Sequence, residues 1–127
     1  MLGALCVTLA LTVPAVVHAE GSDKKQKGDY LPIEGLAATV MRDGGGHGVM
    51  TVEAGVNVPD PVLRSYADSV QPRLRDAYAR TLQTYAGQLI PGTAPDADYL
   101  ARRLQDVTNQ VLGKPGARLL LGGVMVN

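Results

Sequence analysis

The 127-residue chain has few of the side chains on which most enzymes depend. It contains one cysteine and two histidines, and its five aromatic residues are all tyrosine. Its twelve basic residues are balanced by twelve acidic ones, so the formal net charge is zero. Since neutralisation of phosphate groups supplies most of the affinity of proteins for nucleic acids, a chain without excess positive charge argues against a nucleic-acid partner.

Charge is also missing from the start of the chain. Residues 1–17 are rich in Leu, Ala, Val and Thr and contain no charged side chain. Val17 and Ala19 place small residues at the two positions that signal peptidase inspects, and the polar Glu20 follows. This is the layout of an export signal peptide, so we predict a signal over residues 1–19, cleaved between Ala19 and Glu20. The alternative is an uncleaved membrane anchor. A membrane span needs roughly 20 apolar residues, however, and this run is shorter and interrupted by Pro14.

A basic residue normally opens such a signal, and none lies between Met1 and the apolar run. We therefore expect a basic stretch upstream of Met1. The layout is compatible with the general and with the twin-arginine export route. Either route delivers the processed protein to the periplasm, which is the location we expect.

The single cysteine, Cys6, lies within the predicted signal. It follows the bulky Leu5 and comes too early in the chain for a lipidated cysteine, which a small residue should precede. Processing would leave a chain with no thiol and no disulfide, so its stability would depend on the hydrophobic core. By composition, residues 20–29 form a polar, flexible leader, and residues 30–127 form one domain.

The first half of this domain has the pattern of a β-hairpin. An extended segment at 30–33 leads into a strand at 36–42, and a glycine-rich turn at 43–48 leads into a second strand at 49–58. Apolar and polar residues alternate along the second strand, which predicts one buried face. That face consists of Met50, Val52, Ala54, Val56 and Val58.

Helical spacing follows the hairpin. Asp60 is suited to an N-cap and Pro61 to the first helical position, and an apolar stripe at spacings of three and four continues to Tyr85. Pro72 is expected to kink this long helix or to divide it into two pieces, and Gly87 to end it. A second helix is predicted from Asp96 to about residue 112, where Gly113 and Pro115 stop it.

The pattern of the last segment, residues 118–127, predicts a strand that is apolar on both faces. Simple alternation assigns Leu119, Leu121 and Met125 to one face and Leu120, Val124 and Val126 to the other. Gly122 and Gly123 suggest a bulge or a close backbone approach. A strand that is apolar on both faces is either central in a covered sheet or buried against a partner. The predicted fold is therefore α+β, in which this strand completes a small antiparallel or mixed sheet with helices on one face.

Few residues offer catalytic or metal-binding chemistry. The glycine turn at 43–48 joins two strands, whereas a phosphate-binding loop joins a strand to a helix. His47 is the only histidine outside the signal, and metal sites need three or four convergent ligands. Paired carboxylates could be assembled from Glu53, Asp76 or Asp106, but surface charge explains each of them. We expect no catalytic residue, no metal and no cofactor.

Three parts of the chain resemble the periplasmic domain of the FliL family of flagellar basal-body-associated proteins. The first is the strand at 49–58, and the second is the helix with Pro72 followed by Arg-Asp within 71–77. The third is the ending, a helix at 104–112 followed by an apolar strand at 119–127 that closes on an amide residue. The resemblance covers roughly residues 30–127 and is carried by the spacing of apolar residues.

This resemblance implies a stomatin-like fold, ring-type self-association and a supporting role near the flagellar motor. Members typically keep an uncleaved membrane helix, so a processed chain would be a divergent periplasmic relative. We expect a non-catalytic structural or interaction protein with a protein partner or self-association. The alternative is a small periplasmic ligand-binding or enzyme domain with the His47 loop at its mouth. The residues expected to form the interaction surface are Leu119, Leu121, Val124 and Val126.

Overall fold

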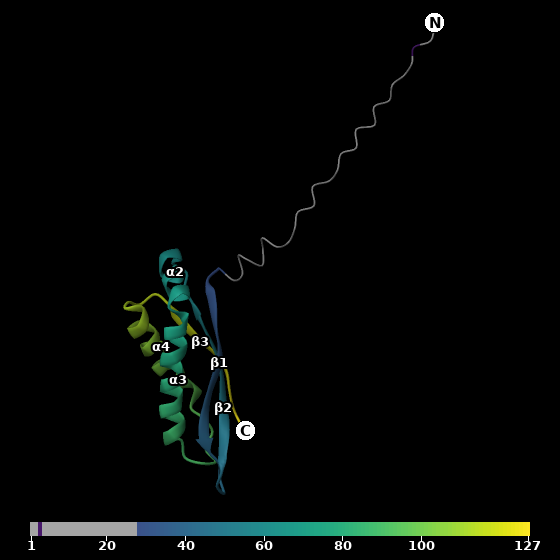
Figure 1. Cartoon of the computed structure of the whole chain (residues 1–127), viewed down its shortest axis with the longest axis vertical. Coiled ribbons are helices and arrows are strands. Elements are labelled where there is room, and N and C mark those ends of the chain that lie inside the picture. Colours follow the sequence, from purple (N-terminus) through teal and green to yellow (C-terminus); the bar gives the residue numbers. More distant parts are fainter. Residues whose placement is uncertain (1–2, 4–27) are drawn as a thin grey trace.

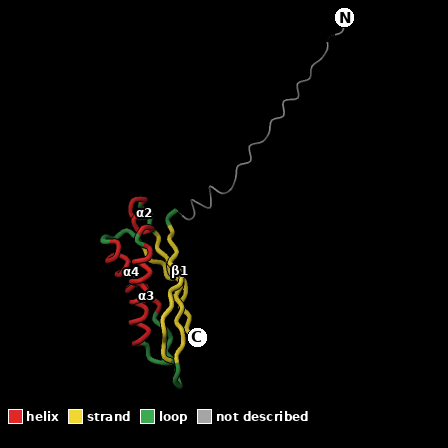
Figure 2. The backbone as a smooth tube through the Cα atoms, viewed as in Figure 1, coloured by secondary structure: helices red, strands yellow, loops and turns green. Residues whose placement is uncertain are grey.

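The computed structural model describes residue 3 and residues 28–127, in which an antiparallel sheet is covered on one face by helices. The elements follow the order β1 (Tyr30–Met41), β2 (His47–Asn57), α2 (Pro61–Ser69), α3 (Gln71–Gln88), α4 (Ala97–Leu112) and β3 (Arg118–Val126). Figure 1 shows α3 and α4 side by side in one layer and the three strands in the other. The α+β class predicted from the sequence is confirmed. The same two layers appear in Figure 2.

The sheet has the order β1-β2-β3, so the chain's last strand is an edge strand and not a central one. β2 pairs antiparallel with both neighbours, which places Ala38 beside Met50 and Met50 beside Val126. β1 begins at Tyr30, earlier than predicted, because Pro32 does not interrupt it. Proline has no N–H to donate, which an edge strand tolerates where that position faces away from the sheet.

The hairpin turn is as the glycines predict. Gly44, Gly45 and Gly46 all have positive φ angles, which side chains disfavour. The Arg42 N–H donates to the carbonyl oxygen of Gly46 at 3.0 Å and so closes the turn. On the other side of the domain, the N–H of Val58 donates to the carbonyl oxygen of Asp29, the last residue of the expected leader.

The predicted long helix is divided at Val70, two residues before Pro72. The Asp60 side chain caps α2 by accepting from the N–H of Val62 at 3.3 Å, and Pro72 occupies the first turn of α3. The predicted division is thus confirmed. Gly87 does not end the helix, which continues to Gln88; in place of a left-handed glycine, Leu89 closes it by donating its N–H to Ala86.

The second predicted helix, α4, has the expected ends. The Asp96 side chain accepts from the N–H of Tyr99 at 3.0 Å, and Gly113 has a φ of 76° at the C-terminus. Near its two ends, Ala97 is exposed and Val111 is partly buried. The buried residues of α4 are Leu100, Leu104, Val107, Thr108 and Leu112.

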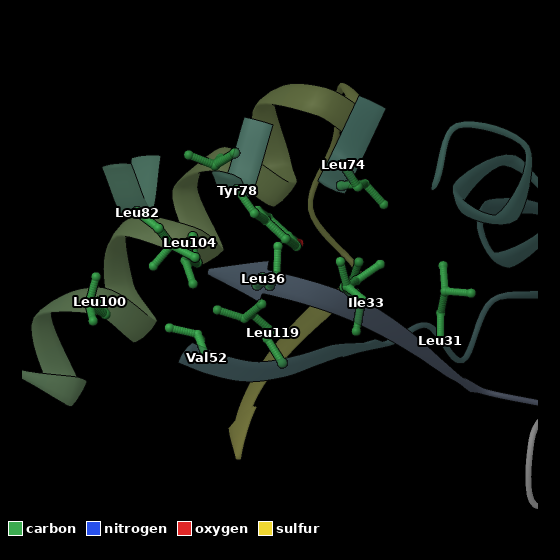
Figure 3. Packing of buried hydrophobic residues seen from close by; sticks show 14 of the residues in the cluster. Leu31, Ile33, Leu36, Val52, Leu74, Tyr78, Leu82, Leu100, Leu104 and Leu119 are labelled. Atoms are coloured by element: carbon green, nitrogen blue, oxygen red, sulfur yellow. The ribbon is translucent and has the colours of Figure 1, made fainter. Parts of the chain in front are cut away.

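The core lies between the helical layer and the inner face of the sheet. In Figure 3, Leu82 and Leu104 from the helices point towards Leu36 and Leu119 from the strands. Tyr78 is fully buried among them, and its hydroxyl group is hydrogen-bonded to the hydroxyl group of Thr108. Burial raises the pKa of Tyr78 to about 12, because the charged form would have to leave water.

Candidate interaction surface

A bulge in β3 decides where its side chains point. Glu53 of β2 pairs with Gly123. The next residue of β2, Ala54, pairs with Leu121, which leaves Gly122 as an extra residue in β3. One extra residue shifts the alternation of all side chains beyond it. Four side chains of β3 therefore share the inner face with the buried residues of β2: Leu119, Leu121, Val124 and Val126.

The face assignment from simple alternation is thus wrong for the residues beyond Gly122. The four residues expected to form an interaction surface do lie on one face, but it is the face that the helices cover. Leu119 is only 8% exposed and belongs to the core, and Leu121 and Val124 pack against it. Val126, at 43% exposed, is the most exposed side chain of this set.

The outer edge of β3 is covered in its first part by α4. An edge strand presents one row of N–H and C=O groups that no neighbouring strand satisfies. The side-chain amide of Gln105 donates to the carbonyl oxygen of Ala117 at 2.8 Å and accepts from the N–H of Leu119 at 2.9 Å. This side chain therefore takes the place of a neighbouring strand at the start of β3.

The opposite edge of the sheet, β1, is covered by α3. The Gln83 side chain accepts from the N–H of Thr39 at 3.2 Å, and the Gln71 side chain donates to the carbonyl oxygen of Pro32 at 3.0 Å. The two contacts lie near the two ends of the strand. Together with the missing N–H of Pro32, they make β1 a poor template for another strand.

The C-terminal part of β3 is a free edge. Asn127 donates its N–H to the carbonyl oxygen of Val49 at 3.1 Å, so its backbone groups point towards β2. Because these directions alternate along an antiparallel pair, the backbone groups of Val124 and Val126 point away from the sheet. Within residues 28–127, no hydrogen bond reaches these outward groups. We call the stretch 124–126 the free edge.

Apolar side chains are also exposed on the sheet face opposite the helices, which we call the open face. The large apolar residues on it, 39–57% exposed, are Tyr30, Met41, Val49, Leu120 and Met125. Glu53 divides this face at the level where both neighbouring strands carry a bulge, at Glu34–Gly35 and at Gly122. The alternation of polar and apolar residues along β2 predicts that this face is exposed to solvent. It does not reveal that β1 and β3 place apolar side chains on the same face.

A groove of about 630 Å³ adjoins the free edge on the helical side. Its lining includes Leu89, Ile90 and Val126, together with Arg42 and Asp43 at the hairpin turn. Ile90 is 71% exposed. Apolar surface therefore flanks the free edge on both sides, the groove on the helical side and Met125 on the open face. Leu89 and Ile90 follow a helix and carry no periodic pattern, so sequence reasoning did not single them out.

The residues considered for catalysis do not converge. His47 is exposed at the start of β2 and does not line the groove, although Asp43 does. Glu53 lies on the open face, whereas Asp76 belongs to α3 and pairs with Arg80 at 2.8 Å. In the part of the chain that the structure describes, no three His, Cys, Asp or Glu side chains are grouped as metal ligands.

The predicted cleavage position between Ala19 and Glu20 lies outside the described residues. Among the residues that the structure describes, no helix has the length and apolar character needed to cross a membrane. No protein-family model and no curated protein matches the chain.

Proposed function

We propose that this chain is an exported, non-catalytic structural or interaction protein of the periplasm. The observation that carries the interaction part of the proposal is the free edge at 124–126, flanked by apolar surface on both faces of the sheet. Unpaired backbone groups beside exposed apolar side chains are features that bind protein chains. A supporting role at the flagellar basal body and a stomatin-like fold belong to the same proposal.

The order of the elements supports the proposed relation to the FliL family. A strand hairpin, a helix divided near Pro72, a second helix and a closing apolar strand occur in the sequence positions on which the resemblance rests. Motility tests the flagellar part of the proposal. Deleting the gene from the organism that encodes it should reduce swimming, and unchanged swimming would contradict a role at the motor.

Export is tested on the full chain with a C-terminal tag. We expect the periplasmic fraction to contain a product whose N-terminus is Glu20, and Ala19→Arg to leave the precursor uncleaved because signal peptidase requires a small residue there. A full-length product in the membrane fraction would support the uncleaved anchor. A full-length product in the cytoplasm would contradict export.

The interaction itself is tested by site-specific photo-cross-linking in the periplasm. A photoreactive residue at Met125, which is 57% exposed, should form a cross-linked product with a protein. The same residue at Arg102, on the exposed side of α4, is the matched control and should give none. Equal cross-linking at both positions, or none at Met125, would contradict the assignment of the interaction to this side of the sheet.

The groove favours one second candidate, a small ligand-binding or enzyme domain. It combines an apolar lining with Arg42 and Asp43. Under this candidate, Asp43→Ala should change the phenotype of the cell more than His47→Ala, because His47 does not line the groove. If neither substitution changes the phenotype, this candidate loses its support.

A further inference from the structure

The free edge sets demanding requirements on any chain that binds it. The bound segment must be extended, because only an extended backbone can pair with the outward N–H and C=O groups of Val124 and Val126. Its side chains alternate between two apolar surroundings. Those on the helical side would lie beside the groove with Ile90, and those on the other side beside Met125 on the open face.

The chain itself contains a segment that meets these requirements. Residues 124–126 are uncharged and apolar on both faces, with Val124 and Val126 on the inner face and Met125 on the open face. The edge of β1 meets them less well, because Gln71 and Gln83 already bond to the outward groups of Pro32 and Thr39. A head-to-tail ring that joins β3 of one copy to β1 of the next is therefore disfavoured, so the pairing inferred below differs from the ring-type self-association that the resemblance to the FliL family implies.

We propose that two copies of this chain pair through their free edges, antiparallel and about a two-fold axis. This deepens the proposed interaction function by naming the partner as a second copy. Met125 lies opposite Met125 of the second copy, and Val124 exchanges both backbone hydrogen bonds with Val126 of the second copy. The two sheets join into one, in the order β1-β2-β3-β3-β2-β1, with both helical layers on the same face. Such an interface is isologous and closes on itself.

Sedimentation of the exported protein over a range of concentrations tests the pairing. We expect a monomer–dimer equilibrium, and Val124→Pro should raise its Kd about tenfold or more, because proline removes an outward N–H that no hydrogen bond within residues 28–127 uses. Ala37→Pro is the matched control, since Ala37 occupies an outward position of β1. It should leave the Kd unchanged. A monomer at every concentration overturns the pairing, and equal effects of both prolines would indicate a β1–β3 contact instead.

Disulfide trapping gives an answer that does not depend on how the proline variants fold. With Cys6 replaced by Ser, Met125→Cys should form a covalent dimer under oxidising conditions, because directly opposed residues of a non-hydrogen-bonded pair approach closely enough for a disulfide. Val49→Cys is the control on the central strand and should stay monomeric. Trapping of both variants would indicate face-to-face packing, and trapping of neither would overturn the pairing. A monomer that still cross-links to another protein at Met125 would overturn the pairing while leaving the proposed function intact.

Discussion

Gln105 of α4 holds Leu119 of β3 through a 2.9 Å hydrogen bond between its side-chain oxygen and the backbone N–H. The same side chain binds the carbonyl oxygen of Ala117, so it satisfies two consecutive outward groups of an edge strand. Beyond Leu119, no hydrogen bond from another described residue reaches the outward backbone groups of the strand. The domain therefore protects the start of its last strand and leaves the end, residues 124–126, open to another chain.

Replacing Gln105 with Ala should destabilise the domain by about 1–2 kcal/mol, because partly buried N–H and C=O groups lose their partners. Urea unfolding followed by circular dichroism measures this change. Gln110→Ala is the matched control, since Gln110 is exposed on the same helix, and it should shift the free energy of unfolding by less than about 0.5 kcal/mol. Equal effects of the two substitutions would show that the cap contributes nothing.

The buried Tyr78–Thr108 pair predicts an asymmetry between two conservative substitutions. In Tyr78→Phe, the Thr108 hydroxyl group still donates to the carbonyl oxygen of Leu104 at 2.7 Å, so the cost should be about 0.5–1.5 kcal/mol. In Thr108→Val, the buried Tyr78 hydroxyl group loses its partner, and the cost should be about 1–3 kcal/mol. Thermal unfolding of both variants measures the order. The reverse order would contradict the hydrogen-bonding assignment.

The raised pKa of Tyr78 predicts a loss of stability at high pH. The folded state keeps this proton up to a pH of about 12, whereas the unfolded chain releases it near the ordinary value of 10.0. Stability is therefore fully present below pH 10 and falls as the pH rises towards 12, by about 2–3 kcal/mol from this group. Denaturation at pH 9 and at pH 11.5 should show a smaller loss for Tyr78→Phe than for the wild type. An identical loss would refute the assignment.

A side chain at Gly55 should destabilise the domain, because the ring of Tyr30 lies over this residue on the open face. A Cβ at Gly55 would overlap the Tyr30 ring. We expect Gly55→Ala to destabilise the domain by about 1–3 kcal/mol and to cost much less when Tyr30 is also replaced by Ala. Gly87→Ala is the control. It has open space within α3 and should stabilise the domain by about 0.5–1 kcal/mol.

Local signals in the sequence predicted much of the fold. Asp60, Asp96 and Gly113 mark helix ends through their own backbone and side-chain chemistry. Pro72 lies in the first turn of α3, and the predicted long helix is divided two residues before it, at Val70. The prediction that Gly87 ends the helix was wrong. The helix continues through this glycine to Gln88, and the N–H of Leu89 caps its end by bonding to the carbonyl oxygen of Ala86.

The interaction surface was harder to predict, because it depends on pairing across the sheet. The glycines at 122 and 123 suggest a bulge, but only the register with Glu53 shows that Gly122 is the extra residue. That single residue moves Val124 and Val126 to the inner face. Where the covered part of β3 ends likewise depends on Gln105, whose hydrogen bonds to Ala117 and Leu119 are tertiary contacts that no local pattern reveals.

Amide hydrogen exchange at several protein concentrations tests the central claim most directly. We predict that the exchange of the Val124 and Val126 amides slows as the concentration rises, because pairing with a second copy protects them, while the outward amide of Ala37 exchanges quickly at every concentration. Exchange at Val124 and Val126 that stays equally fast at all concentrations would contradict the pairing of two copies through the end of β3.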